Sequence, residues 1–331
     1  MTHRCEKSLL AVVVIGRNEG ERLRVCLTSA LKSNVTETLV YVDSGSTDQS
    51  AELAKSMGCD VLALDMRVPF TAARARNEGF ARAISLVPNL DLVQFVDGDC
   101  EIASGWLVQA KDFLAQHDTI AVACGRRRER FPQKSIYNQL CDIEWDSPAG
   151  QTRSCGGDAM MRVSAFAAVG GYQQSLIAGE EPELCVRLRA NGWKIWRLDC
   201  EMTLHDAAMF RIGQWWNRAK RAGHAFAEGA SLHGAKPERH YVPEYRRALS
   251  WGMVLPVTIA ATAIWNPAFL LLLLIYPLQA MRLALTSQLP GTLAWWRALF
   301  LVLGKFPEAQ GICRFYFNKL LSKSATLIEY K

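Results

Sequence analysis

Two aspartates separated by one glycine mark the segment of this chain best suited to chemistry. Asp97-Gly98-Asp99 follows the apolar, strand-like residues 92–96. Neighbouring carboxylates repel each other unless a proton, arginines or a hard cation neutralise them, and oxygen ligands suit Mg²⁺ or Mn²⁺. The segment therefore predicts a divalent-cation site with positions left open for phosphate oxygens. The alternative is a solvated turn, because Asp and Gly are common in turns.

Strands and helices alternate around this segment. Apolar runs cover residues 10–15, 38–42, 60–64 and 92–96, with helical stretches between them. Strands that alternate with helices predict a parallel sheet, and ligands bind such sheets at the carboxyl ends of the strands. We therefore expect the polar turns after the first, second and fourth strands to share one crevice.

These turns carry groups that suit a nucleotide. Asp43 ends the second strand, where its carboxylate can accept hydrogen bonds from a base or a ribose. Ser46 or Thr47 could cap the following helix, which is also the simple structural interpretation of that turn. Arg76 lies in or at the start of a helix, where its guanidinium could meet a carboxylate or a diphosphate. A solvated helix face is the alternative for Arg76.

Composition and charge indicate a folded protein without a nucleic-acid partner. Of the 331 residues, 50% are apolar and 21% are charged, which is unlike a disordered chain. The net charge of +6 is modest, and arginine clusters such as residues 126–128 fit an anionic lipid or a phosphorylated substrate as well as nucleic acid. The ten cysteines contain no Cys-x-x-Cys pair and predict reduced, mostly buried thiols. No secretory signal is apparent.

Residues 252–280 contain no charged residue and predict a membrane element. They suit one long span, but Pro256, Pro267 and Pro277 interrupt them, so two short spans in a tight hairpin are also possible. Flanking arginines on both sides favour a hairpin with both ends cytoplasmic. A buried soluble helix is the remaining alternative.

A second apolar stretch, residues 292–306, carries Arg297 and Lys305 among its aromatic residues and predicts an amphipathic helix along the membrane interface. Composition thus divides the chain into a catalytic domain of residues 1–240 and a membrane-associated helical region of residues 241–331.

Five motifs follow one another along the chain, namely Val14-Ile15-Gly16-Arg17-Asn18-Glu19, Tyr41-Val42-Asp43-Ser44-Gly45-Ser46-Thr47-Asp48, Ala75-Arg76-Asn77-Glu78-Gly79, Asp97-Gly98-Asp99 and Gly179-Glu180-Glu181-Pro182-Glu183-Leu184. In this order they resemble the family 2 glycosyltransferases, which have the GT-A fold. The resemblance covers roughly residues 8–235. It implies a Rossmann-like, mostly parallel α/β sheet and transfer of a sugar from a nucleotide diphosphate with inversion at the anomeric carbon.

The resemblance also implies roles for individual residues. Asp43 is similar to the family's base-binding aspartate, and Arg76 to its arginine near the nucleotide. His205 lies where many relatives have a histidine that reaches the metal or the diphosphate, although a structural histidine is the alternative. The residues expected to bind the nucleotide are Arg17, Glu19, Asp43, Arg76 and Asp97, and the expected metal ligands are Asp97, Asp99 and His205.

A further carboxylate must take the proton from the attacking acceptor hydroxyl. Glu181 is the candidate, because it matches the aspartate of a Glu-Asp pair that precedes a helix in the family. The longer side chain leaves Glu180 as a competitor, and helix capping is the alternative for both. Asp99 is expected to act on the other side of the sugar, where a bound cation stabilises the leaving group. Glu183 is expected to pair with Arg187 one helical turn later.

The predicted function is metal-dependent, inverting sugar transfer to a lipid-linked or polysaccharide-precursor acceptor. The enzyme is expected at the inner, cytoplasmic membrane with its catalytic domain facing the cytoplasm. Residues 155–161 resemble the family's acceptor-side region, and residues 214–218 depart from the Gln-Arg-Trp signature of processive synthases. Nucleotidyl transfer is one alternative, although Glu19 fits poorly where such enzymes have a basic loop. A membrane module that binds a nucleotide sugar without turnover is the other.

Overall fold

The computed structural model describes residues 8–321 and residue 328, and these fall into two compact units. The first unit comprises residues 8–134, 141–176 and 180–208. The second comprises residues 135–140, 177–179 and 209–321, with residue 328. The functional division at residue 240 stays a prediction.

Within the described residues, the first unit is built on a nine-stranded mixed sheet. The strand order is β3-β2-β1-β4-β8-β6-β9-β5, and β7 pairs with β9. The strands are β1 (Leu10–Gly16), β2 (Thr38–Asp43), β3 (Asp60–Ala63), β4 (Leu92–Asp97), β5 (Cys100–Ile102), β6 (Ile120–Glu129), β7 (Gly150–Thr152), β8 (Ala159–Arg162) and β9 (Lys194–His205).

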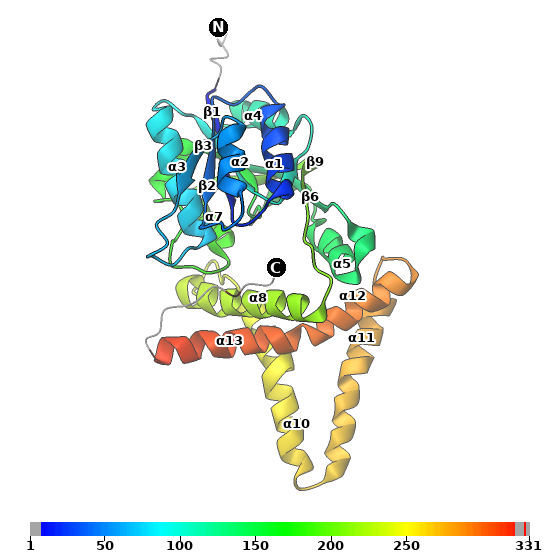
Figure 1. Cartoon of the computed structure of the whole chain (residues 1–331). Coiled ribbons are helices and arrows are strands. Elements are labelled where there is room, and N and C mark those ends of the chain that lie inside the picture. Colours follow the sequence, from blue (N-terminus) through cyan, green and yellow to red (C-terminus); the bar gives the residue numbers. More distant parts are fainter. Residues whose placement is uncertain (1–7, 322–327, 329–331) are drawn as a thin grey trace. The chain divides into compact units, whose positions relative to one another are not determined.

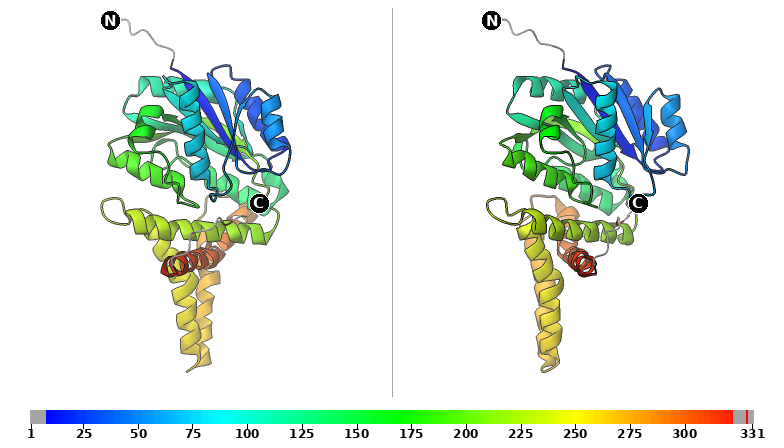
Figure 2. Two further views of the ribbon diagram at one scale, coloured as in Figure 1. Left: turned by 60° about the vertical axis from the view of Figure 1, so that its left-hand side comes forward. Right: turned by 90° about the vertical axis from the view of Figure 1, so that its left-hand side faces the viewer.

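Helices cover both faces of this sheet. The chain moves from β1 through β2 to β3 in one direction and then returns to place β4 on the other side of β1. Because parallel crossovers are right-handed, this reversal puts α1 (Glu21–Leu31) and α2 (Ser50–Ser56) on one face and α3 (Ala72–Leu86) on the other (Figure 2). The remaining helices that begin between β5 and β9 are α4 (Trp106–Gln116), the 3₁₀ turn η1 (Pro132–Lys134), α5 (Ile136–Trp145), α6 (Val163–Ala168) and α7 (Glu180–Ala190).

The four strands predicted from the sequence are confirmed. β1 pairs in parallel with both β2 and β4, so the turns after these three strands lie at one edge of the sheet, as expected. Residues 10–14 are fully buried, which explains their uninterrupted apolar character. Beyond β4 the sheet is mixed, because β8 runs antiparallel to β4 and β6. No disulfide joins the cysteines that the structure describes, and most of them are buried.

The second unit is helical, and its most exposed part is a hairpin of two long arms (Figure 1). The first arm runs without a break through α9 (Val242–Leu249), the π-helical turn η2 (Ser250–Val254) and α10 (Leu255–Ala263). The chain turns at Trp265, and the Asn266 side chain accepts a hydrogen bond from the backbone N–H of Ala268 (3.0 Å). The second arm is η3 (Pro267–Leu274) followed by α11 (Ile275–Leu285). Of the arrangements that the sequence left open, the structure therefore has the interrupted hairpin.

The second arm has the length and composition of a membrane span. Among the described residues, the helix at residues 267–285 is both long enough and apolar enough to cross a membrane. Its most apolar window has a mean hydropathy of 1.9. Side chains at the tip and along the arm are strongly exposed, including Ile264 (83%), Trp265 (82%) and Leu271 (68%). The predicted interfacial stretch is also helical, as α12 (Gly291–Leu303), with Ala294 and Ala298 buried.

Glycines set the distance between α8 (Ile212–His233) and α13 (Lys305–Leu320), which lie side by side (Figures 1 and 2). A Cβ at Gly223 of α8 would collide with the carbonyl oxygen of Glu308, and one at Gly311 of α13 would collide with that of Lys220. Both glycines are therefore required by the close approach of the two backbones.

We expect Gly223→Ala to destabilise the second unit. Overpacking costs about 1–3 kcal/mol, more than the roughly 1 kcal/mol that alanine gains over glycine in a helix. Gly213→Ala is the matched control, because it lies in the same helix and a Cβ added there would have no atom within 4 Å. Thermal unfolding in detergent should show a lower midpoint for Gly223→Ala only. Equal midpoints would contradict the packing described here.

Candidate functional site

The turn after β2 is organised by the carboxylate of Asp43. Its Oδ2 accepts hydrogen bonds from the backbone N–H groups of Gly45 (3.1 Å) and Ser46 (2.9 Å), and its Oδ1 accepts one from the Tyr41 hydroxyl (3.1 Å). Asp43 is buried. These bonds fix both the loop and the direction in which the carboxylate points.

The turn after β1 is joined to this loop through Asn18. The Asn18 side-chain oxygen accepts from the backbone N–H of Thr47 (2.7 Å), and the Ser46 hydroxyl accepts from the backbone N–H of Asn18 (3.0 Å). Ser46 and Thr47 thus connect the two turns and do not cap α2, so the capping expectation was wrong. At the start of α2, Asp48 accepts from the N–H of Ser50 (3.0 Å).

The first turn also carries Arg17 and Glu19. The Arg17 guanidinium lies 4.8 Å from the centre of the Phe70 ring, and Glu19 pairs with Arg22 at 2.8 Å. Glu19 also lies beside the aspartate turn, because a Cβ at Gly98 would be 3.2 Å from its Cγ. Sheet topology therefore brings the turns after β1, β2 and β4 together, as predicted.

Two arginines pair with the Asp97 carboxylate. Its Oδ1 lies 2.7 Å from Arg76, and its Oδ2 lies 3.4 Å from Arg127. Arg76 is only 2% exposed and also pairs with Glu180 at 2.8 Å. A buried guanidinium requires compensation of its charge, and Asp97 and Glu180 supply it by accepting from Nη2 and Nη1.

Asp158 also belongs to this network of ion pairs and hydrogen bonds around Asp97. It is fully buried, and its Oδ1 accepts from the backbone N–H of Asp97 (2.9 Å). Its Oδ2 pairs with Arg127 (2.7 Å) and accepts from the Thr203 hydroxyl (2.8 Å). Sequence reasoning missed the contributions of Asp158 and Arg127. The only signal was that Asp158 belongs to the glycine-rich segment of residues 155–161.

Each arginine of the cluster at residues 126–128 forms an ion pair with an acidic residue. Arg126 meets Asp146 (3.1 Å) and Arg128 meets Asp142 (3.0 Å), while Arg127 meets Asp158. These ion pairs account for a cluster that the sequence suggested as a phosphate-attracting patch.

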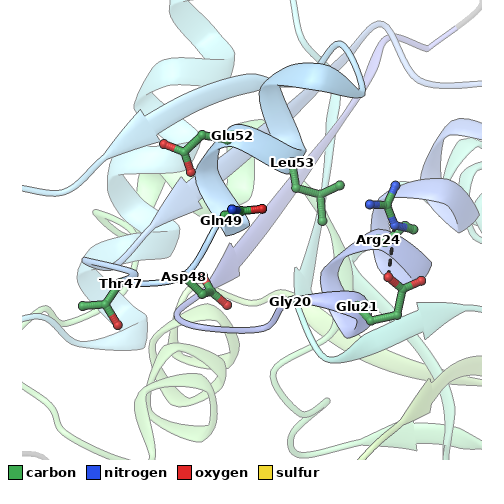
Figure 3. Close-up of a pocket in the computed structure, with 8 residues that line it drawn as sticks. All are labelled: Gly20, Glu21, Arg24, Thr47, Asp48, Gln49, Glu52 and Leu53. Carbon is green, nitrogen blue, oxygen red and sulfur yellow. Dashed lines mark hydrogen bonds and ion pairs between the residues drawn. The ribbon is translucent and has the colours of Figure 1, made fainter.

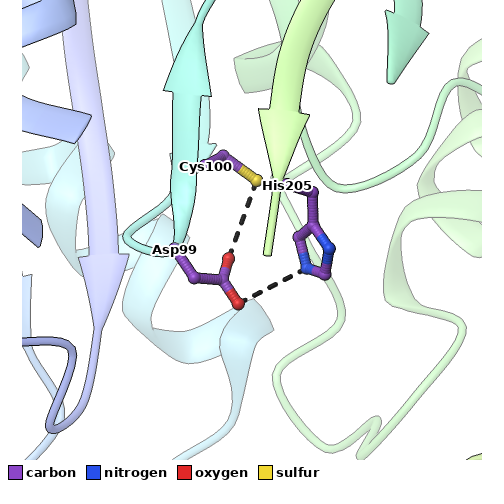
Figure 4. Close-up of side chains that lie close together, drawn as sticks. All are labelled: Asp99, Cys100 and His205. Atoms are coloured by element: carbon purple, nitrogen blue, oxygen red, sulfur yellow. Dashed lines mark hydrogen bonds and ion pairs between the residues drawn. The ribbon is translucent and has the colours of Figure 1, made fainter. Parts of the chain in front are cut away.

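Asp99 faces His205 across the β5–β9 ladder (Figure 4). Asp99 Oδ2 lies 3.4 Å from His205 Nε2, and both side chains are buried. The Cys100 thiol lies 3.6 Å from Asp99 Oδ1. On the other side of the imidazole, Nδ1 lies 3.8 Å from Glu129, and the Trp145 ring packs edge-on at 4.9 Å between centroids. Glu129 and Trp145 thereby restrict the orientation of the histidine ring.

This arrangement fits a divalent cation. Cation–ligand distances of about 2.1 Å place adjacent ligands of an octahedral ion about 3 Å apart, close to the Asp99–His205 separation of 3.4 Å. Glu129 lies behind the histidine, and its carboxylate is 3.8 Å from Nδ1, which is beyond hydrogen-bond distance. Asp97 belongs to a different group, with Cys100 and Asp158, although Cys100 is common to both groups. In the structure, Asp99 thus lies beside His205, whereas Asp97 pairs with the arginines.

The two glutamates at the start of α7 face different neighbours. Glu180 meets Arg76, whereas Glu181 is 4% exposed and lies against two thiols. Glu181 Oε1 accepts from the backbone N–H of Cys155 (2.6 Å) and from the thiols of Cys155 and Cys185 (2.9 Å each). The expected Glu183–Arg187 ion pair is confirmed, at 2.6 Å.

A separate surface pocket lies between α1 and α2 (Figure 3). None of the predicted site residues lines it. Three of its lining residues are acidic (Glu21, Asp48 and Glu52), and Arg24 is paired with Glu21. Such a lining disfavours an anionic diphosphate.

Comparison with known proteins bears on the fold. Residues 11–169 match the model of a family described as Glycosyl transferase family 2. Succinoglycan biosynthesis protein ExoA of Rhizobium meliloti (strain 1021) is 24% identical over 267 residues, covering 76% of this chain and 78% of that protein.

Two solved structures share most of the chain's architecture. Mannosyltransferase PcManGT from Pyrobaculum calidifontis, in complex with GDP-Man and Mn²⁺, has a TM-score of 0.66 at 18% identity, covering 94% of this chain and 87% of that chain. TarS 1–349 of S. aureus has a TM-score of 0.55 at 16% identity, covering 92% and 91%. The predicted GT-A fold is confirmed.

We expect Asp158→Ala to lower the free energy of unfolding by about 3–5 kcal/mol, because it leaves the buried Arg127 guanidinium without its nearest partner. Asp60→Ala is the control, since it removes the more exposed Asp60–Arg82 pair (2.8 Å) and should cost less than about 1 kcal/mol. Denaturant unfolding measures both. Similar losses for the two variants would show that the network does not depend on Asp158.

Proposed function

We propose that the chain is a member of glycosyl transferase family 2, whose model matches residues 11–169, and that it transfers a sugar from a nucleotide-diphosphate donor to an acceptor hydroxyl with inversion, using a divalent cation. The observation that carries the cation is the Asp99–His205 pair, 3.4 Å apart at the sheet edge that also holds Asp43. The Mn²⁺ in the PcManGT complex supports the same choice of ion. When bound, the cation would act as a Lewis acid that stabilises charge on the departing diphosphate.

The donor would be held by residues from the three turns. Asp43 is fixed by backbone N–H groups and by Tyr41, so its carboxylate is oriented before a base or ribose arrives. Arg17 and Glu19 occupy the adjoining turn. Arg76 and Arg127 provide positive charge beside Asp97, where the diphosphate oxygens would develop charge. In this proposal Asp97 positions the arginines, and Asp99 with His205 holds the ion.

Glu181 is the proposed base. Glu180 Oε1 is 2.8 Å from the buried Arg76 guanidinium, so this carboxylate is engaged in an ion pair. Glu181 has no arginine partner among the described residues, and its Oε1 is held by three donors. Within that part of the chain, Oε2 receives no hydrogen bond and is the oxygen that would accept the proton of the acceptor hydroxyl.

The proposed acceptor is lipid-linked or a polysaccharide precursor. ExoA, which is similar over most of this chain, is described as a succinoglycan biosynthesis protein. The exposed apolar hairpin supports a membrane location, at the inner membrane with the first unit facing the cytoplasm. A membrane-bound enzyme would meet such an acceptor at the bilayer surface.

Asp99→Ala is expected to abolish cation-dependent sugar transfer, lowering the rate by at least about 100-fold. The assay incubates membranes containing the full chain with radiolabelled nucleotide sugars and Mn²⁺, with and without a chelator. Asp112→Ala, at an exposed position of α4, is the control and should retain activity. Donor binding without product in the wild type would favour the module without turnover. Full activity of Asp99→Ala would refute the proposed ion site.

Replacing Leu271 and Leu274 by lysine should release the protein from membranes, because two charges in the second arm oppose its burial in lipid by several kcal/mol. Flotation with liposomes measures the change. Val108→Lys, at an exposed position of α4, adds charge outside the hairpin and should still float. If the double variant floats like the wild type, the hairpin is not the anchor.

A further inference from the structure

Two buried thiols converge on the carboxylate proposed as the base. Cys155 precedes the glycine pair Gly156-Gly157, and Cys185 lies one turn into α7 from Glu181. Their sulfur atoms are 3.9 Å apart, and each is 2.9 Å from Glu181 Oε1. We propose that Cys155 and Cys185 are positioning residues that fix the rotation of the Glu181 carboxylate and leave its second oxygen to accept the proton of the acceptor hydroxyl. This inference rests on the proposed role of Glu181.

The geometry explains why thiols suit this position. Three donors on Oε1, including the Cys155 backbone N–H, fix the rotation of the carboxylate and leave Oε2 as the proton acceptor. Because thiols are weak donors, they orient the group while lowering its basicity less than an arginine would.

The same segment connects the base to the donor side. Gly157 lies against the arginine network, since a Cβ there would be 2.7 Å from Arg76 Nη2 and 3.2 Å from Asp97 Oδ2. Asp158 then binds Arg127 and the backbone of Asp97. Four consecutive residues thus position the proposed base and the proposed donor-binding arginines relative to each other.

The thiols remain donors over the working range of pH. Burial raises the pKa of Cys185 to about 11, and burial raises the pKa of Cys155 well above its usual value. The charge of Glu181 also acts on Cys124 of β6 and on Tyr172, and burial is the main reason why the pKa of both groups is raised.

The test is the pH dependence of kcat/KM in the full-length protein, using the nucleotide sugar identified by the radiolabel assay. Removing both donors in Cys155→Ala/Cys185→Ala should favour the protonated carboxylate and move the acidic limb upward by about 0.5–1 pH unit, a roughly 3- to 10-fold loss below the limb. Cys155→Ser/Cys185→Ser keeps two donors and should retain the wild-type limb. The KM for the donor should be unchanged in both.

Cys59→Ala is the matched control, because it removes a buried thiol at the start of β3, outside the site. An unchanged limb in the double alanine variant, or equal shifts in the alanine and serine variants, would overturn the positioning role. Glu181→Gln separates the two proposals. If Glu181→Gln is inactive and the limb does not move, only the thiol inference fails, whereas a fully active Glu181→Gln removes the proposed base itself.

A second measurement covers the case in which the double alanine variant does not fold. Thiols bonded to a carboxylate have S–H stretching bands at lower frequency than thiols bonded to a neutral amide. The infrared difference between wild type and Glu181→Gln should therefore show two shifted S–H bands. Absence of that difference would equally contradict the inference.

Discussion

The ion-pair network around Asp97 is the constraint on which the site depends. Arg76 and Arg127 are largely buried, and their charges are matched by Asp97, Glu180 and Asp158. Removing charged groups from water costs several kcal/mol per ion, so each buried arginine requires its partners in place. Those partners come from the end of β4, the start of α7 and the segment before β8. The network therefore fixes three distant parts of the sequence relative to one another.

Because of this network, the two aspartates have different neighbours. One residue separates Asp97 from Asp99, yet the first faces arginines and the second faces His205. Gly98 allows this, because it approaches within van der Waals contact of the β1 backbone, where a side chain would be crowded by the carbonyl of Ile15 at 3.1 Å. The turn can thus present one carboxylate to arginine side chains and the other to His205, where we propose that an ion binds.

In the second unit, close packing of helix backbones has the role that ion pairs have in the first unit. α8 and α13 approach through Gly223 and Gly311, and Gly252 of the first hairpin arm meets α13 at Lys305. Close backbone packing of this kind gives the base of the hairpin a defined geometry while its arms stay uncovered. An apolar hairpin that rises from a rigid helical base fits insertion into lipid better than it fits a soluble core, because so little of its apolar surface is buried.

The sequence by itself determined the local and periodic features of this protein. Buried strands such as residues 10–15 are continuous apolar runs that end in polar turns, and the uncharged residues 252–280 predict an apolar element. Each of these signals lies in neighbouring residues, so it can be read without the tertiary structure. Asp43 and Asp99 could be selected for the same reason. Only the tertiary structure decided that Asp97 faces Arg76, that Asp158 supports it from 61 residues away, and that Glu180 and Glu181 have different neighbours. Those choices depend on long-range pairing and on the direction of each side chain, and sequence spacing does not encode either.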